Sequence, residues 1–293
     1  AATAALRSGA GLVTVACPER ILDTVQTLVP CATCLPLAPD TDTAWAQLEA
    51  LLASADAVGM GCGLGQSPWA AALTARCLEW LSTHRTPGVI DADALNLLAG
   101  MEPASYDLSR CAITPHPGEA ARLLGSDVPT IAADAPQAAM QLRNRWGAAV
   151  VLKGAASVLA AAEGLALNIV GTPAMAKGGS GDALTGILTA LLARDRAQKT
   201  HTGMLPLMQT GCRLHGLAGC MAADRFGERG ALATDLCALL GNAWAYSVER
   251  ETTFTGRGTP PNRRESAPAP AGAALLSQRI LRDDGAAFCL KNE

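Results

Sequence analysis

Aromatic and charged side chains are both scarce in this sequence. Aromatic residues make up 3% of the 293 residues and charged residues 17%, with a net charge of −3. So few aromatic rings remove the stacking platforms on which single-stranded nucleic acids bind, and a slightly acidic chain does not attract a phosphate backbone. No apolar run approaches the roughly 18 residues of a membrane span, and no signal peptide is visible. We therefore expect a cytoplasmic protein without nucleic acid or membrane partners.

Paired cysteine motifs are also lacking, although the chain contains ten cysteines. Cys31-x-x-Cys34 is the one close pair, and no second pair complements it, which argues against a zinc site. Buried, reduced thiols in a cytosolic protein are the simpler interpretation. Hydrophobic side chains, in contrast, make up 49% of the chain. This composition predicts a sizeable core, in one large domain or two small ones.

Short apolar strands alternate with amphipathic helices along most of the chain. Apolar, β-branched runs predict strands at 12–16 (a buried strand), 34–37, 57–59, 89–90, 111–114 and 149–152, and a hairpin of 157–161 with 165–170. Helical periodicity is found at 1–7, 19–28, 43–53, from 68 onward, 131–146, 181–193, 204–226 and 231–248. This alternation predicts an α/β fold with a mostly parallel sheet and helices on both faces.

Polar motifs follow directly after four of the predicted strands, at 59–65, 91–96, 114–119 and 153–154. In open parallel sheets, ligands bind at the carboxyl ends of the strands. We therefore expect these four loops to share one site.

A glycine-rich turn, Gly178-Gly179-Ser180-Gly181, opens the helix that continues from Asp182. Glycine tolerates positive φ and has no Cβ to block a ligand, and the free N–H groups and dipole of a helix N-terminus attract an anion. The turn is therefore predicted to bind a phosphate group. The Asp182 carboxylate either caps the helix or acts as a general base beside the anion.

The strand-end loops each allow two interpretations. The glycines of 61–65 form either a tight turn or a loop that a ligand approaches closely. Asp91 or Asp93 either holds magnesium through water or caps the next helix. Lys153 either meets a phosphate or is a solvated lysine at a turn, and Lys177 adds positive charge before the glycine turn.

Histidines are few, and only one has a setting typical of ligand contact. Two prolines hold His116 in the loop 114–119, whereas His84, His201 and His215 are expected to be structural or solvated. Glu119 falls in the first turn of the following helix, where it suits the helix dipole and is also able to reach a hydrated cation.

Six motifs, taken together and in this order, resemble the ADP/ATP-dependent NAD(P)H-hydrate dehydratase family of the ribokinase-like superfamily. They cover about residues 1–240 and read LRSGAGLVTVACPE, GMGCGLGQS, DADALNLL, ITPHPGEAARLLG, VVLKGAAS and GTPAMAKGGSGDALTGILTALLA. The resemblance implies a three-layer α/β sandwich with a mostly parallel central sheet. It also implies repair of hydrated NADH or NADPH: the ring hydroxyl is phosphorylated with ADP or ATP and Mg²⁺, and loss of phosphate restores the double bond.

The resemblance assigns residue roles as well. Asp182 is the implied catalytic base, and the N–H groups of the turn are implied to stabilise the transferring phosphoryl group. The implied nucleotide-binding residues are Lys153, Gly154, Ala155, Ala156, Ser157, Gly179, Ser180 and Gly181. The hydrated dinucleotide is implied to contact Gly63, His116 and Asp182, and Glu119 is implied to reach the metal through water.

Family members begin with a further strand and a glycine-rich loop, which we expect upstream of this chain, and many carry an epimerase domain. We predict a dehydratase domain over 1–249 and a disordered tail over 250–293, because the tail is rich in Pro, Gly, Ser and Thr without apolar periodicity. A homo-oligomer, a tetramer by analogy, is expected. Two alternatives are a small-molecule kinase of the same fold and an inactive fragment that only binds nucleotide.

Overall fold

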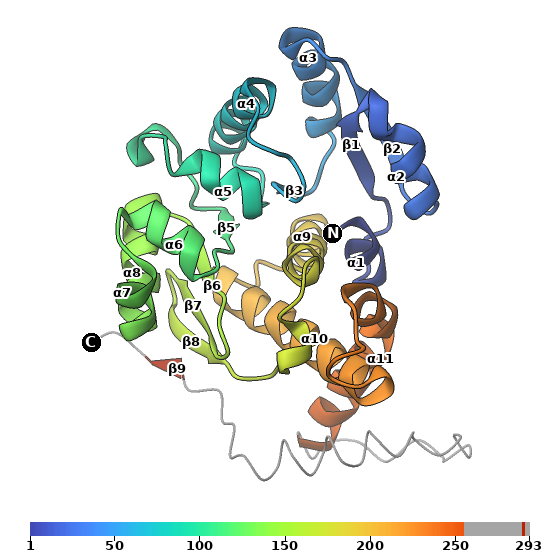
Figure 1. The fold of residues 1–293 in the computed structure, drawn as a ribbon, viewed down its shortest axis with the longest axis vertical. Coiled ribbons are helices and arrows are strands. Elements are labelled where there is room, and N and C mark those ends of the chain that lie inside the picture. Colours follow the sequence, from blue (N-terminus) through green and yellow to red (C-terminus); the bar gives the residue numbers. More distant parts are fainter. Residues whose placement is uncertain (255–288, 291–293) are drawn as a thin grey trace.

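A central sheet organises the computed structural model, which describes residues 1–254 and 289–290 of the chain (Figure 1). Within these residues the strand order is β3-β4-β5-β6-β7-β8-β9. The first four strands are parallel: β3 (Val58–Met60), β4 (Gly88–Ile90), β5 (Cys111–Ile113) and β6 (Ala149–Leu152). The last three are antiparallel: β7 (Ser157–Ala161), β8 (Gly164–Asn168) and β9 (Cys289–Leu290). The predicted mostly parallel sheet and the predicted hairpin are thus confirmed.

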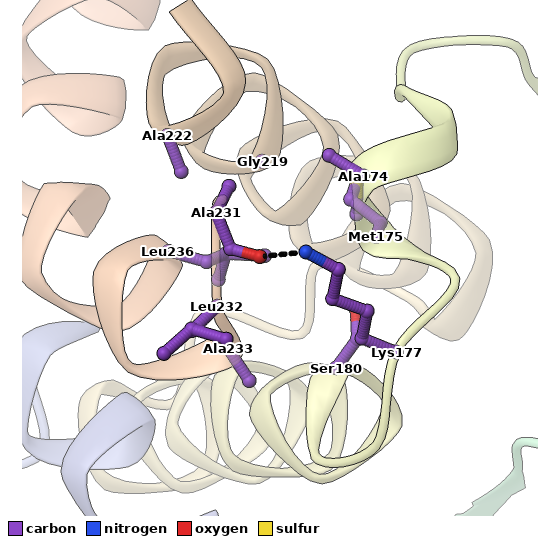
Figure 2. Close-up of a pocket in the computed structure, with 10 residues that line it drawn as sticks. All are labelled: Ala174, Met175, Lys177, Ser180, Gly219, Ala222, Ala231, Leu232, Ala233 and Leu236. Carbon is purple, nitrogen blue, oxygen red and sulfur yellow. Dashed lines mark hydrogen bonds between the residues drawn. The ribbon is translucent and has the colours of Figure 1, made fainter. Parts of the chain in front are cut away.

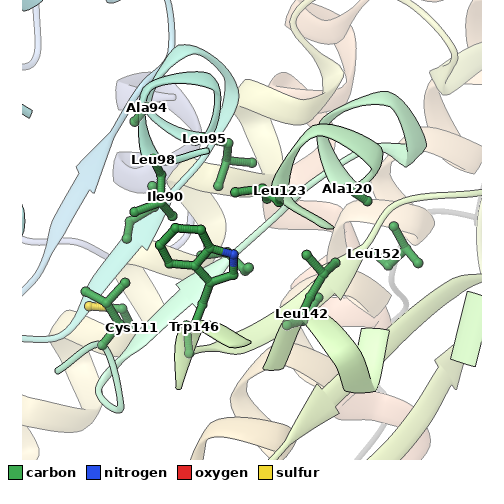
Figure 3. Close-up of a cluster of buried hydrophobic side chains, with 14 of the residues drawn as sticks. Ile90, Ala94, Leu95, Leu98, Cys111, Ala120, Leu123, Leu142, Trp146 and Leu152 are labelled. Atoms are coloured by element: carbon green, nitrogen blue, oxygen red, sulfur yellow. The ribbon is translucent and has the colours of Figure 1, made fainter. Parts of the chain in front are cut away.

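One face of the sheet packs against a group of helices between residues 68 and 146 (Figure 1). They are α4 (Pro68–His84), α5 (Ala92–Leu98), α6 (Pro117–Leu124), α7 (Val128–Ala133) and α8 (Ala135–Trp146), with the short 3₁₀ turn η2 (Pro103–Ser105) between them. Ile90, Ile113 and Val150 point to this side, where Trp146 fills the centre of the core (Figure 3). Side chains alternate across a strand, so Val89, Ala112 and Val151 face the opposite layer.

The opposite layer consists of helices from the second half of the chain together with the first helix. The turn η3 (Pro173–Met175) leads to α9 (Ser180–Gln198), followed by α10 (Met204–Phe226) and α11 (Ala233–Phe254). Helices α9 and α10 pack on the sheet, and α1 (Ala2–Arg7) and α11 pack on their outer side (Figure 1). The result is a sandwich of three layers, helix, sheet and helix, as the resemblance implied.

The predicted buried strand at 12–16 was wrong in position and in environment. Among the described residues, strand β1 (Thr14–Pro18) pairs only with β2 (Thr33–Leu37), in a separate two-stranded parallel sheet at the edge of the fold (Figure 1). Leu12 is 74% exposed. Helix α3 (Thr41–Leu52) packs on this small sheet, and η1 (Glu19–Ile21) and α2 (Leu22–Leu28) connect its strands. A short apolar run indicates a strand but not which sheet it joins, and a two-stranded sheet buries little of it.

The helix predicted over 131–146 is two helices, because the chain turns at Asp134. The Asp134 side chain accepts the N–H of Gln137 and so caps α8, while Asp127 caps α7 by accepting the N–H of Thr130. Pro136 in the first turn of α8 has no N–H to continue an earlier helix. The predicted start of α4 is confirmed: the Ser67 side chain caps the helix by accepting the N–H of Ala70.

Regular structure continues beyond residue 249, where the domain was predicted to end. Helix α11 continues to Phe254, and Cys289–Leu290 form β9 beside β8. Residues 255–288 and 291–293 lie outside the described residues, so the predicted disorder of 250–293 stays a prediction. Within the part that the structure covers, no helix has both the length and the apolar character needed to cross a membrane.

Candidate active site

The four strand-end loops meet at one edge of the sheet, as predicted. The N–H of Asp91 donates to the carbonyl oxygen of Met60 at 3.0 Å, which joins the loops after β3 and β4. The N–H of Lys153 donates to the carbonyl oxygen of Pro115 at 2.8 Å, which joins the loops after β5 and β6. The shared site therefore rests on hydrogen bonds between neighbouring loops.

The first turn of α9 faces these loops. Thr185 donates its hydroxyl to Asp91 Oδ2 at 2.8 Å. A Cβ on Gly181 would lie 3.2 Å from Lys153 Nζ and 3.6 Å from Asp91 Oδ2. One carboxylate oxygen of Asp182 lies within 4.8 Å of both an Asp91 carboxylate oxygen and the sulfur of Cys62. The glycine turn, the lysine and two carboxylates thus form a single cluster.

Two backbone donors at this end of α9 lack a partner in the described part of the chain. Gly179 occupies the N-cap position with φ +86°, a conformation that favours glycine. Among residues 1–247, the N–H groups of Gly181 and Asp182 have no hydrogen-bond acceptor, whereas the N–H of Ser180 lies 3.3 Å from the carbonyl oxygen of Lys177. An anion at this end of the helix would therefore meet Gly181 and Asp182 first. Among residues 1–247, the Asp182 carboxylate accepts no hydrogen bond, which argues against the interpretation of Asp182 as a cap.

Asp91 is the buried partner of Lys153. Its side chain is 1% exposed, and Lys153 Nζ lies 2.8 Å from Oδ1. Burial alone would raise the pKa of Asp91, but the charge and hydrogen bond of Lys153 and the Thr185 hydroxyl outweigh it and lower the pKa. Asp91 is the N-cap residue of α5 yet forms no capping hydrogen bond there. Asp93 instead accepts the N–H of Gly65 at 2.8 Å, so the alternative that either residue caps α5 is wrong.

His116 and Glu119 form a reciprocal cap at the start of α6. His116 Nδ1 accepts the N–H groups of Gly118 and Glu119, and Glu119 Oε2 accepts the N–H of His116 at 2.8 Å. The His116 side chain is 52% exposed and its Nε2 carries the proton, since Nδ1 accepts. Glu119 is 6% exposed and lies 3.8 Å from Lys153 Nζ. Burial raises the pKa of Glu119, partly offset by the His116 N–H and by the charge of Lys153.

Lys177 does not add its charge to the anion site. Its ammonium donates to the carbonyl oxygens of Arg229 and Ala231 at 2.6 Å each. Figure 2 shows the hydrogen bond to Ala231 beside a small cavity lined by residues of η3, α9, α10 and the start of α11. Lys177 therefore links the start of the glycine turn to the loop before α11 by hydrogen bonds.

Three residues near the site were missed or undervalued by sequence reasoning. Burial and the nearby carboxylates of Asp182 and Asp91 raise the pKa of Cys62 to about 12, so its thiol stays protonated. Thr185 follows Gly181 by one helical turn, a spacing that places it on the same face of α9. His215 on α10 contacts Ser180, a pairing across 35 residues for which the sequence holds no local signal.

The arrangement defines a class of protein before any comparison. A three-layer α/β sandwich places a glycine-rich helix N-terminus, a lysine and a neighbouring carboxylate at the carboxyl edge of its sheet, the arrangement of a ribokinase-like protein. The chain belongs to the NAD(P)H-hydrate dehydratase family, whose model matches residues 1–241.

Individual relatives agree with this membership. The chain is 40% identical over 238 residues to the bifunctional NAD(P)H-hydrate repair enzyme Nnr of Escherichia coli (strain K12), covering 81% of this chain and 42% of that protein. The chain thus spans less than half the length of this curated relative. The structure resembles the ADP/ATP-dependent NAD(P)H-hydrate dehydratase from Bacillus subtilis, co-crystallized with ATP/Mg²⁺ and soaked with CoA, with a TM-score of 0.65, 25% identity and 84% coverage of each chain.

A third comparison bears on the fold alone. A ribokinase-like superfamily protein from Enterococcus faecalis V583 gives a TM-score of 0.65 at 23% identity, covering 84% of this chain and 81% of that one. The implied ribokinase-like fold is thereby confirmed.

Proposed function

We propose that this chain catalyses the nucleotide-dependent dehydration of NADH or NADPH hydrated at C6 of the nicotinamide ring. The observation that carries the proposal is the cluster at the N-terminus of α9. There the Gly181 and Asp182 N–H groups, the Lys153 ammonium and the Asp182 carboxylate lie together. The family membership supports the proposal, as does the resemblance to the ADP/ATP-dependent NAD(P)H-hydrate dehydratase from Bacillus subtilis.

The chemistry follows from what these groups can do. Hydroxide is a poor leaving group and phosphate a good one. Asp182 takes the proton of the ring hydroxyl. The hydroxyl oxygen forms a bond to the terminal phosphorus of the nucleotide, while the bond between that phosphorus and the bridging oxygen breaks. The N–H groups at the start of α9 and Lys153 stabilise the charge on the transferring phosphoryl group. The ring C–O bond then breaks, its electron pair leaves with the phosphate, and loss of a ring proton restores the double bond.

The two ligands are assigned to neighbouring parts of the site. Residues 153–157 and Gly179–Gly181 would hold ADP or ATP, and Gly154, Ala155 and Ala156 are exposed beside Lys153. Gly63 and His116 would hold the hydrated dinucleotide. Both are exposed, and a Cβ on Gly63, at φ +66°, would meet no atom within 4 Å. These residues therefore leave room for a ligand.

Mg²⁺ would neutralise phosphate charge when bound with the nucleotide. Carboxylate oxygens are ligands that this ion prefers, usually with several of its waters retained. One Glu119 oxygen accepts the His116 N–H and the other lies 3.4 Å from His116 Nε2, so Glu119 would reach the ion only through one of its waters.

The wider assignments are part of the same proposal. We propose that the dehydratase domain comprises residues 1–249. We also propose that the protein is cytoplasmic and forms a homo-oligomer, a tetramer by analogy with the family. The proposal concerns dehydration alone, since the curated relatives are named as bifunctional and the chain spans less than half of their length.

Incubation of the purified protein with hydrated NADH, Mg²⁺ and either ADP or ATP tests the proposal. The expected result is nucleotide-dependent recovery of the absorbance of reduced nicotinamide together with release of free phosphate. A stable phosphorylated product without phosphate release would replace the proposal with a kinase. Stabilisation by nucleotide without turnover of any kind would leave a binding protein.

A further inference from the structure

A histidine of the second helical layer lies directly behind the anion-binding turn. His215, on α10, has its Nε2 2.8 Å from the carbonyl oxygen of Ser180 and 3.3 Å from Ser180 Oγ. Ser180 is the first residue of α9. A carbonyl oxygen only accepts hydrogen bonds, so Nε2 carries the proton and donates it. This assigns the tautomer without reference to any ligand.

The position of the imidazole matters because the turn it contacts has unusual backbone freedom. Three of the four residues from Gly178 to Gly181 are glycines, and Gly179 has φ +86°. Glycine loses more conformational entropy on ordering than any other residue. A turn of this composition needs outside contacts to hold its N–H groups in one direction.

Two such contacts come from opposite sides of the first turn of α9. On the sheet side, Thr185 bridges Asp91 Oδ2 at 2.8 Å and the carbonyl oxygen of Gly181 at 3.3 Å. On the α10 side, His215 holds the carbonyl oxygen of Ser180. The Gly181 and Asp182 N–H groups follow immediately in the chain, so their directions depend on where Ser180 is held.

The imidazole is suited to this task because it stays neutral. Burial, and to a lesser extent the charge of Lys153, lower the pKa of His215 to about 4. The hydrogen bond to Ser180 raises the pKa but is outweighed. Ser180, which the ring contacts, directly precedes Gly181, and a Cβ on Gly181 would lie 3.2 Å from Lys153 Nζ. A neutral donor fixes the backbone there without placing a second full charge beside Lys153.

Resting on the proposed function, we infer that His215 is a positioning residue: by donating Nε2–H to the Ser180 carbonyl oxygen, it holds the first turn of α9 so that its N–H groups meet the nucleotide phosphate. Preorganised donors stabilise developing charge because they need not reorganise during the reaction. His215 acts through Ser180 and contacts neither ligand itself.

The test compares two substitutions of His215 in the full chain. His215→Gln keeps an N–H donor of similar reach, and His215→Leu removes it. We expect His215→Leu to raise the Kd for ADP, measured by calorimetry, about tenfold, which is the loss of roughly one hydrogen bond to a preorganised site. We expect His215→Gln to stay within about threefold of the parent by the same reasoning.

Two further measurements separate positioning from general loss of stability. Cys212→Ala, one turn earlier on α10 and packed in the core on the sheet side, controls for mutation of this helix and should leave the Kd for ADP unchanged. Hydrogen exchange at the amides of Gly181–Ala183 should be faster in His215→Leu than in His215→Gln or Cys212→Ala. Equal ADP affinity and equal exchange in the Leu and Gln variants would overturn the inference. Absence of dehydration by the parent protein, with ADP binding intact, would refute only the proposed function.

Discussion

Lys153 Nζ lies 2.8 Å from the carboxylate of Asp91, a residue 62 positions earlier in the chain. The pair joins the ends of β4 and β6, and Thr185 extends it to α9 through Asp91 Oδ2. The Asp91 side chain is 1% exposed and the Lys153 side chain 22% exposed, so the pair has a buried member and one that reaches the site. The pair therefore holds a positive charge beside the glycine turn at the start of α9.

The pair predicts strongly non-additive stability effects. Lys153→Met leaves a buried carboxylate without its partner, and we expect a loss of about 3–5 kcal/mol in the free energy of unfolding. The double variant Asp91→Asn with Lys153→Met should be more stable than Lys153→Met alone, because no unpaired charge stays buried. Urea unfolding of the parent, both single variants and the double variant measures the coupling.

An exposed ion pair in the same chain supplies the control for this cycle. Arg76 and Asp42 lie 2.6 Å apart, but the Asp42 side chain is 87% exposed. Arg76→Met should cost less than about 1 kcal/mol. Equal losses in Arg76→Met and Lys153→Met would contradict the role assigned to Asp91.

Gly181 is expected to tolerate no side chain while nucleotide is bound. A Cβ there would already lie 3.2 Å from Lys153 Nζ and 3.6 Å from Asp91 Oδ2, so a larger side chain would crowd the groups proposed to surround the phosphate. Gly181→Val should weaken ADP binding by at least about tenfold, since it blocks the approach to the helix N-terminus. Gly241→Val is the matched control, because a Cβ on Gly241 in α11 meets no atom within 4 Å. Unchanged affinity in Gly181→Val would argue against an anion site at this turn.

Asp182→Asn tests the general base. The substitution preserves size but removes the proton acceptor, so we expect turnover to fall by about 10²–10⁴-fold, with ADP affinity largely retained. Steady-state dehydration and ADP calorimetry are the two measurements. Asp56→Asn, at an exposed position before β3, should behave like the parent. Near-normal turnover of Asp182→Asn would remove Asp182 from the proposed mechanism.

Stability should depend on pH through His215. Burial lowers the pKa of His215 to about 4 in the folded chain, against 6.5 for an unperturbed histidine. Between these values the unfolded chain binds a proton that the folded chain does not, so this contribution is complete above pH 6.5 and is lost as the pH falls toward 4. The parent should be less stable at pH 5 than at pH 7 by about 2 kcal/mol on this account.

Comparison with His215→Gln isolates that contribution in urea unfolding at both pH values. The raised pKa of Glu119 acts in the opposite direction, but it is present in both proteins and cancels in the comparison. The same pH dependence in parent and variant would show that His215 is not held neutral by its surroundings.

Local sequence signals predicted most elements and the place of the site. Ser67-Pro68 starts α4, the glycine turn precedes α9, and 204–226 matches α10 residue for residue. The polar residues after β3, β4, β5 and β6 do meet, because parallel strands bring their carboxyl ends to one edge. Two features could not be predicted from such signals. Apolar periodicity does not show which sheet the strand near 12–16 joins, and it does not show that one helical pattern is divided into two capped helices at Asp134.

By itself, the sequence determined the alternating elements, the turn at Gly178–Gly181 and the motifs typical of the family, since each depends on residues within a few positions of one another. Only the tertiary structure decided the partners. Asp91 with Lys153, Asp91 with Thr185 and His215 with Ser180 are separated by 62, 94 and 35 residues. Which side chains meet over such distances depends on strand order and on how α9 and α10 pack on the sheet, and these arise from burial of the whole core.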